Sequence, residues 1–298
     1  MSPAPGSAGA WLLAIRPRTL PAAVAPVVVG AALAGTWGLF ALGPAAAALV
    51  AALLIQVATN LANDYFDFLK GTDTEARVGP VRVVQAGLLS PEAVWRGTVL
   101  TLVAALGVGL YLVWMGGWPI LVVGLLALVC AVAYTGGPFP LAYHGLGDLF
   151  AFVFFGPVAV AGTVWVQGRF FHPEFVLAGA GVGALVTAIL VVNNLRDRET
   201  DALAGKRTTA VRFGVTGTRI FYVALILAAA AVPPVGMGVF GWSPWTLLAV
   251  VGLGLVMRPL EAVLTFHDPR DLFPALGGTA RVVTWYAGLL ALGFVMGS

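Results

Sequence analysis

The sequence predicts an all-α integral membrane protein, a bundle of about nine transmembrane helices. The chain is 60% hydrophobic and only 10% charged, with a mean hydropathy of +0.96. A soluble domain usually carries about 25% charged residues. Apolar runs recur along the whole chain, and basic residues collect on one predicted side of the membrane. Spans of about 20 residues use up the length, so we expect one transmembrane domain over residues 1–298.

Each predicted helix is an apolar run long enough, or nearly long enough, to cross the hydrocarbon core. Gly and Ala are abundant in these runs, which suits close packing between helices inside lipid. The predicted spans are 20–40, 43–62, 93–114, 118–135, 146–166, 174–195, 217–240, 243–258 and 277–296.

The basic residues predict the orientation. With nine spans, the N-terminus and the loops after the even-numbered spans share one side. That side holds 15 of the 16 Lys and Arg residues and leaves only Arg169 opposite. Cytoplasmic loops collect Lys and Arg. We therefore expect a multi-pass protein of the cell inner membrane, with its N-terminus and its charged loops in the cytoplasm.

Charge is concentrated in two windows, which we expect to form two Asp-rich cytoplasmic loops. The first charged window (60–96) and the second charged window (193–219) together hold 18 of the 29 charged residues. When Asn60 is set against Asn194 without gaps, six of fifteen positions are identical. Both windows follow an even-numbered span, which suggests a duplicated four-helix unit plus a ninth helix. The identical pairs are Asn60 and Asn194, Leu61 and Leu195, Asp67 and Asp201, Leu69 and Leu203, Gly71 and Gly205, and Thr74 and Thr208.

The acids of each window are spaced to share one helix face, if the spans continue as helix. Asn60, Asp64 and Asp67 stand at i, i+4 and i+7, and Asn194, Asp197 and Asp201 at i, i+3 and i+7. Oxygen ligands without His or Cys suit Mg²⁺, which typically binds a few carboxylates plus substrate phosphates. Nearby Lys and Arg side chains would bind the diphosphate oxygens that the metal ion leaves free. The candidates are Lys70, Arg77, Arg82, Lys206 and Arg207.

At these residues the sequence resembles the UbiA superfamily of intramembrane prenyltransferases. The family's Asn-Asp-x-x-Asp motif reads NDYFD over 63–67, and its Asp-x-x-x-Asp motif reads DRETD over 197–201. RPRTLP (16–21), YTGGP (134–138), GLGD (145–148) and NNLRD (193–197) resemble the branch that prenylates 1,4-dihydroxy-2-naphthoate in menaquinone synthesis. In the wider superfamily a third acid often lies four residues after the second, where this chain has Gly71. The longer spacing to Asp73 is typical of the naphthoate branch.

The resemblance implies a UbiA-type bundle, a reaction and a set of site residues. A polyprenyl group would pass from polyprenyl diphosphate to the naphthoate with loss of CO₂ and diphosphate, giving demethylmenaquinone. The enzyme would work in the lipid bilayer with Mg²⁺ and no nucleic-acid partner; prenyl chain length and oligomeric state stay open. The implied metal ligands are Asn63, Asp64, Asp67, Asp197 and Asp201, with Asp73 as a further candidate. Lys206 and Arg207 would contact the diphosphate, supported by Lys70, Arg77 and Arg82, and the further substrate-binding candidates are Asn60 and Asn194.

Four residues have two interpretations each. Tyr134 would shield an allylic cation or orient the acceptor, or it is an interfacial tyrosine. Arg16 and Arg18 would bind the acceptor carboxylate, or they anchor the first span on the positive side. Asp148 would belong to the site, or it starts the fifth helix.

Three alternatives to this function can be compared with the sequence. The same chemistry on another acceptor, such as homogentisate, 4-hydroxybenzoate or a chlorophyll or haem ring, differs in few residues. A CDP-alcohol phosphatidyltransferase would carry a D-G-x-x-A-R core, which is absent. A transporter would place ionisable residues in the middle of its spans, whereas these spans carry charge at their ends.

Overall fold

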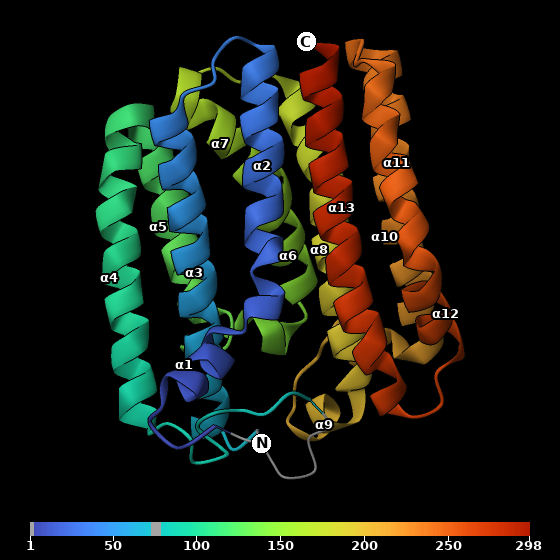
Figure 1. Cartoon of the computed structure of the whole chain (residues 1–298). Coiled ribbons are helices and arrows are strands. Elements are labelled where there is room, and N and C mark those ends of the chain that lie inside the picture. Colours follow the sequence, from blue (N-terminus) through green and yellow to red (C-terminus); the bar gives the residue numbers. More distant parts are fainter. Residues whose placement is uncertain (1–2, 73–78) are drawn as a thin grey trace.

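The computed structural model describes residues 3–72 and 79–298, and this part of the chain is helical with no strand. The helices stand side by side as a bundle, with the N-terminus at one end and the C-terminus at the other (Figure 1). The α-helices are α1 (Ala8–Ile15), α2 (Pro21–Thr36), α3 (Leu42–Leu69), α4 (Pro91–Gly116), α5 (Trp118–Ala133), α6 (Gly147–Val153), α7 (Ala159–Gly168), α8 (Pro173–Arg196), α9 (Arg198–Leu203), α10 (Thr209–Phe240), α11 (Leu248–Gly252), α12 (Met257–Thr265) and α13 (Phe273–Gly297). Short turns of other helix types are η1 (Pro17–Thr19), η2 (Leu141–His144), η3 (Phe154–Val158), η4 (Pro244–Leu247), η5 (Leu253–Val256) and η6 (Pro269–Leu272).

Each of the nine predicted spans coincides with a helix or a broken helix. Within the described residues, seven helices are long and apolar enough to cross a membrane, and eight if α1, η1 and α2 form one bent span. The remaining helix, α5, has 16 residues and is a shorter apolar helix. The structure therefore confirms an all-helical, multi-pass architecture, whereas the count of nine crossings stays a prediction.

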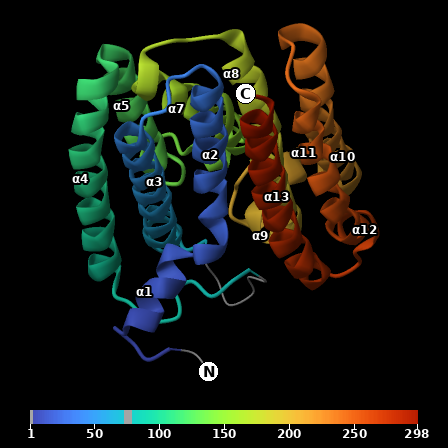
Figure 2. The same cartoon turned by 45° about the horizontal axis from the view of Figure 1, so that its top comes forward.

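Several helices extend beyond the predicted boundaries at the charged end of the bundle. Helix α3 continues to Leu69, past the predicted end at residue 62, and α10 begins at Thr209 instead of 217. Helix α1 was not predicted; it meets α2 at a 50° bend and crosses the end of the bundle (Figure 2). The acidic motifs consequently lie on helix ends, which corrects the expectation that they lie in loops.

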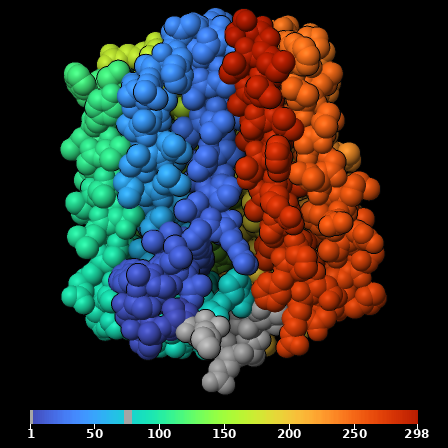
Figure 3. All heavy atoms as spheres, in the orientation of Figure 1, coloured from blue at the N-terminus to red at the C-terminus, as the bar shows by residue number. Residues whose placement is uncertain are grey.

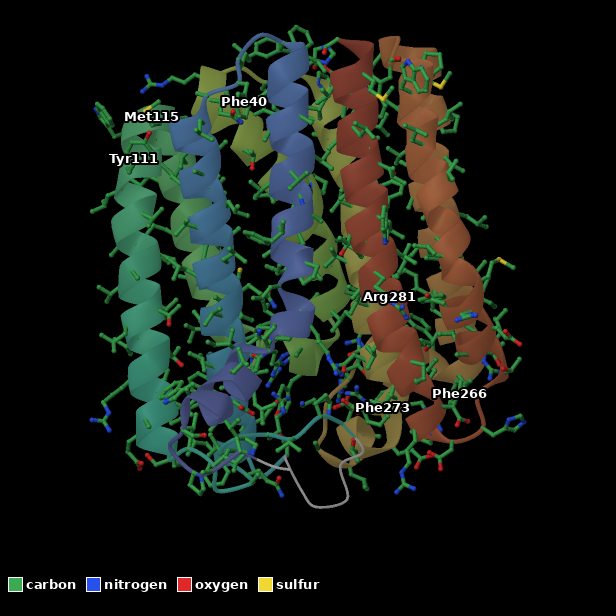
Figure 4. All side chains as sticks on the ribbon, in the orientation of Figure 1. Phe40, Tyr111, Met115, Phe266, Phe273 and Arg281 are labelled. Atoms are coloured by element: carbon green, nitrogen blue, oxygen red, sulfur yellow. The ribbon has the colours of Figure 1, made fainter. Side chains whose placement is uncertain are left out.

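The two ends of the bundle carry different charge. Figure 4 places Tyr111 and Met115 at one end and Phe273 at the other. Arg169 lies at the first end, because its guanidinium donates hydrogen bonds to the carbonyl oxygens of Met115 at 2.6 Å and Trp114 at 3.0 Å. Arg196 lies at the second end, with its Cζ 5.5 Å from the centre of the Phe273 ring. Arg169 is thus separated from the charged windows by the length of the bundle, as the sequence predicted.

Helix α8 is the most buried of the candidate spans. Its glycines allow the segment formed by α6, η3 and α7 to approach it closely. Helices α6 and α7 are joined through the π-type turn η3, where Gly156 leaves helical geometry before Pro157. A Cβ on Gly179 would lie 2.6 Å from the Cα of Pro157, and one on Gly183 would lie 2.5 Å from the carbonyl oxygen of Phe152. Small residues are needed here because backbone meets backbone.

We predict that Gly179→Ala destabilises the protein by about 1–3 kcal/mol, since the added methyl group collides with backbone and not with a movable side chain. Gly107→Ala in α4 is the matched control, because its Cβ would meet no atom within 4 Å. Thermal unfolding in detergent checks both variants. Equal melting temperatures would contradict the packing described for α8.

Candidate functional site

A cavity of about 860 Å³ lies inside the bundle, and most of its charged lining residues gather at one end, the polar end of the cavity. Apolar residues of α2, α3, α4, α5 and α7 line most of it. Helices α2 and α13 both border it, and Figure 3 shows the surface hollowed between them, with atoms of deeper helices visible. The polar and charged lining residues come mostly from both charged windows and from the chain between α1 and α2, and include Arg16, Arg18, Asn60, Asn63, Asp67, Arg82, Asn194, Arg196, Asp197, Asp201 and Lys206.

Asp67, on the last turn of α3, joins the two charged windows. Its side chain is 2% exposed. Oδ2 accepts a hydrogen bond from Nη2 of Arg82 at 3.0 Å, and Oδ1 lies 3.3 Å from Nζ of Lys206. The hydroxyls of Thr72 and Tyr143 donate to Oδ1 at 3.2 and 3.4 Å. One buried carboxylate therefore holds a cation from each window at the polar end of the cavity.

Asp64 has a different environment, although it lies one turn earlier on the same helix. It is buried and is absent from the cavity lining. Its Oδ2 accepts a hydrogen bond from the backbone N–H of Val83 at 3.3 Å. Its Oδ1 lies 3.5 Å from both Arg82 and Arg16. Asp64 thus fixes the segment that carries Arg82 and the chain before α2.

The second motif is split between two helices. Helix α8 ends at Arg196, Asp197 caps it with φ −91° and ψ 8°, and α9 begins at Arg198. The expectation of one continuous helix face holds for Asn60, Asp64 and Asp67, which all lie within α3, and is wrong for the second window. Asp201 lies on α9, with Oδ1 3.6 Å from Nζ of Lys206, so Lys206 bridges the acids of both windows.

The matching positions of the two windows have the same turn. Gly71 and Gly205 both adopt positive φ, 64° and 73°, which favours glycine. The N–H of Thr72 donates to the carbonyl of Asp67 at 3.0 Å, and the N–H of Lys206 donates to that of Asp201 at 2.9 Å. The identities found by aligning the windows therefore correspond to a repeated helix end.

The predicted cations differ in their access to the cavity. Arg82 and Lys206 line it, whereas Lys70 and Arg207 do not, and Arg207 is exposed. Nζ of Lys70 donates to the carbonyl of Thr135 and lies 4.2 Å from the centre of the Tyr143 ring. Burial lowers the pKa of Lys70; Asp67 opposes this shift and Lys206 adds to it. Arg77 and Asp73 lie outside the described residues.

The three asparagines that the sequence predicted as site residues line the cavity, and each is held by a hydrogen bond to a neighbouring group. Nδ2 of Asn60 donates to the carbonyl of Ile15 at 2.8 Å. Oδ1 of Asn63 accepts from the hydroxyl of Thr135 at 2.8 Å. Nδ2 of Asn194 donates to Oδ1 of Asp148 at 3.2 Å.

Tyr134 lines the cavity where α5 ends. Asp148 is buried on the first turn of α6 and also accepts a hydrogen bond from Thr209, so it connects α6, α8 and α10.

The donor atoms suit a magnesium ion by type, because Asn63, Asp67, Asp197 and Asp201 present oxygen to the cavity. Within the described residues, no three His, Cys, Asp or Glu side chains are grouped closely enough to hold a metal by themselves. Magnesium usually takes one or two carboxylates and completes its shell with phosphate oxygens and water. The arrangement therefore fits an ion bound together with a phosphorylated substrate.

Sequence reasoning missed Tyr143 and Thr135 as site residues and used Arg196 only as a topology signal. Tyr143 contacts Asp67, Lys70 and Lys206. Its only signal was its place between two of the family-like motifs, YTGGP and GLGD. Arg196 was visible in NNLRD, directly before the second acidic motif.

Comparison with known proteins shows which family and which fold the chain resembles. The model of the UbiA prenyltransferase family matches residues 23–271. The 1,4-dihydroxy-2-naphthoate octaprenyltransferase of Mycobacterium tuberculosis is 38% identical over 287 residues, covering 95% of this chain and 97% of the relative. The enzyme of the same name from Escherichia coli is 35% identical, covering 91% and 90%.

Two solved structures share the fold at low sequence identity. A UbiA homologue from Aeropyrum pernix has a TM-score of 0.66 at 16% identity, covering 93% of this chain and 97% of that one. A UbiA homologue from Archaeoglobus fulgidus bound to GPP and Mg²⁺ has a TM-score of 0.56 at 15% identity, covering 94% and 99%. The family match and the full-length relatives lead to one conclusion: the chain belongs to the UbiA prenyltransferase family.

Proposed function

We propose that this protein transfers a polyprenyl group from polyprenyl diphosphate to 1,4-dihydroxy-2-naphthoate, in menaquinone synthesis. The observation that carries the proposal is the similarity to naphthoate octaprenyltransferases over almost the whole chain. The site supports it: one end of an apolar cavity has cations and acids for a diphosphate, and the rest suits a prenyl chain. No feature of the described residues favours one of the other aromatic acceptors.

The diphosphate of the donor is proposed to bind at Asp67, Lys206 and Arg82. The two cations reach the cavity from different windows, so together they would contact different oxygens of one diphosphate. Asn63, Asp67, Asp197 and Asp201 are the proposed Mg²⁺ ligands, and Asp64 and Asp73 stay candidates. A bound Mg²⁺ would supply positive charge to the departing diphosphate.

The reaction breaks the allylic C–O bond, and its electron pair leaves with the diphosphate. A ring carbon of the naphthoate forms the new C–C bond and loses its proton. The carboxylate leaves as CO₂ and a proton takes its place, so the product is demethylmenaquinone in its reduced quinol form. The aromatic and aliphatic lining keeps water from the allylic cation. The Tyr134 ring is a proposed shield for that cation.

The charged end of the bundle is proposed to face the cytoplasm of the cell inner membrane, because it holds nearly all basic residues. The soluble naphthoate would enter there. The lipid-soluble product would leave sideways, through the hollow between α2 and α13 (Figure 3).

The proposed reaction predicts a product that mass spectrometry identifies. Purified protein with Mg²⁺, dihydroxynaphthoate and prenyl diphosphates of several lengths should yield prenylated naphthoquinol lacking the carboxylate. Homogentisate and 4-hydroxybenzoate, supplied at equal concentration, should be converted much more slowly. Preferred conversion of either competitor would overturn the assignment of the acceptor.

Lys206→Met should raise the KM for prenyl diphosphate by at least about tenfold, because a charge-assisted hydrogen bond contributes about 1.5–3 kcal/mol. Lys70→Met is the matched comparison, since Lys70 lies outside the cavity lining and contacts Thr135 and Tyr143. We expect a smaller rise in this variant. Steady-state kinetics with saturating acceptor measure both, and equal effects would show that cavity access does not distinguish the two lysines.

Asp67→Asn should lower kcat by at least about a hundredfold, because the buried carboxylate is both a proposed metal ligand and the partner of two cations. Glu261→Gln is the control, an acid-to-amide change at an exposed position on α12. Activity is measured across a Mg²⁺ titration, with gel filtration to verify folding. Normal turnover by a folded Asp67→Asn would remove Asp67 from the proposed machinery.

A further inference from the structure

Arg196 has a guanidinium nitrogen that makes no hydrogen bond within the part of the chain that the structure describes. Arg196 is the last residue of α8, is 3% exposed and lines the cavity. Its Nε donates to Oδ1 of Asp197 at 2.7 Å, and its Nη2 donates to Oδ2 of Asp197 and to Oδ1 of Asn193, each at 2.6 Å. Nη1 is buried and has no hydrogen-bond partner among the described residues.

A buried, charged donor without a partner is costly, so proteins rarely keep one without a reason. The orientation of this guanidinium is nevertheless fixed. Asp197 and Asn193 hold two of its nitrogens, and the Phe273 ring packs against it with its centre 5.5 Å from Cζ. A group fixed in this way loses little freedom when a ligand binds. Nη1 is thus a donor with a fixed orientation on a residue that lines the cavity.

The surroundings of Arg196 suit an aromatic acid. A planar guanidinium matches the geometry of a carboxylate. Phe273, which lines the same cavity, offers an aromatic face beside it. Arg281 lines the cavity two turns further along α13 and adds positive charge on this side (Figure 4). The cations assigned to the diphosphate, Arg82 and Lys206, are instead tied to Asp67 on α3.

We propose that Nη1 of Arg196 binds the carboxylate of the aromatic acceptor, with the Phe273 ring beside the acceptor ring. This makes Arg196 a specificity-determining residue that selects acceptors with an acidic group. The inference rests on the proposed function for the identity of the acceptor. A diphosphate oxygen is the other anion that this nitrogen could bind, and the experiment separates the two.

The test measures ligand preference without turnover. Calorimetry on the purified protein compares 2-naphthoate with 2-naphthamide, which has the same ring and no charge. Wild-type protein should bind the acid at least about tenfold more tightly, as expected for a charged hydrogen bond. R196K keeps a positive charge beside Asp197 but loses the planar fork, and R196Q loses the charge as well. Both should lose most of this preference.

The control is R198Q, because Arg198 is one position past the cap, outside the cavity lining, and pairs with Glu199 at 3.7 Å. It should keep the preference for the acid. Two variants are made at Arg196, so that the test can be carried out with whichever of R196K and R196Q folds. A preference retained in a folded Arg196 variant overturns the proposal, and so does an equal loss in R198Q.

Kinetics then distinguish the carboxylate from the diphosphate and from a merely structural role. In R196K the KM for dihydroxynaphthoate should rise about tenfold while the KM for prenyl diphosphate stays within about twofold. A rise only for prenyl diphosphate would assign Nη1 to the donor and overturn the proposal. If wild-type protein prefers the acid but does not convert dihydroxynaphthoate, the proposed function fails separately.

Discussion

The pairing of Asp67 with Arg82 and Lys206 is the interaction on which the charged end of the bundle depends. A carboxylate this deeply buried is costly unless cations and hydrogen-bond donors surround it. The cations come from the segment after α3 and from the segment after α9. Their convergence therefore requires the two charged windows to meet at this end of the bundle. Asp64 adds backbone contacts that hold the Arg82 segment in place.

The repeated turn explains how two windows far apart in the sequence present similar groups to one cavity. Glycine at the matched positions 71 and 205 allows the backbone to turn at the end of the helix, four residues after Asp67 and Asp201 respectively. In the second window this turn places Lys206 between Asp201 and Asp67. In the first window the same turn places Thr72 where its hydroxyl reaches Asp67. A common helix end thus yields a cation in one window and a hydroxyl in the other.

The sequence predicted the helical class, the approximate spans and the two acidic motifs, because apolar length and charge spacing are local properties. It did not predict that α8 breaks at Asp197, since no Gly or Pro marks that position. It also grouped Asp64 with Asp67, although only Asp67 lines the cavity. Arg207 was paired with Lys206 and proves exposed, because the direction of a side chain after a turn depends on tertiary packing. Arg196 was counted only for topology, because an unpartnered nitrogen is visible only when all neighbouring groups are placed.

The charges at this end also constrain how a donor would bind. Asp67 already contacts both Arg82 and Lys206, so a metal ion bound to Asp67 would compete with both cations. A diphosphate arriving with the metal resolves this competition, because the displaced cations gain phosphate oxygens as the carboxylate gains the metal. Metal alone would leave two cations without their partner, and diphosphate alone would face the carboxylates. Mutual dependence of metal and diphosphate binding therefore follows from the ion pairs themselves. The acceptor side is different in one respect, since Nη1 of Arg196 has no hydrogen-bond partner among the described residues that a ligand would have to displace.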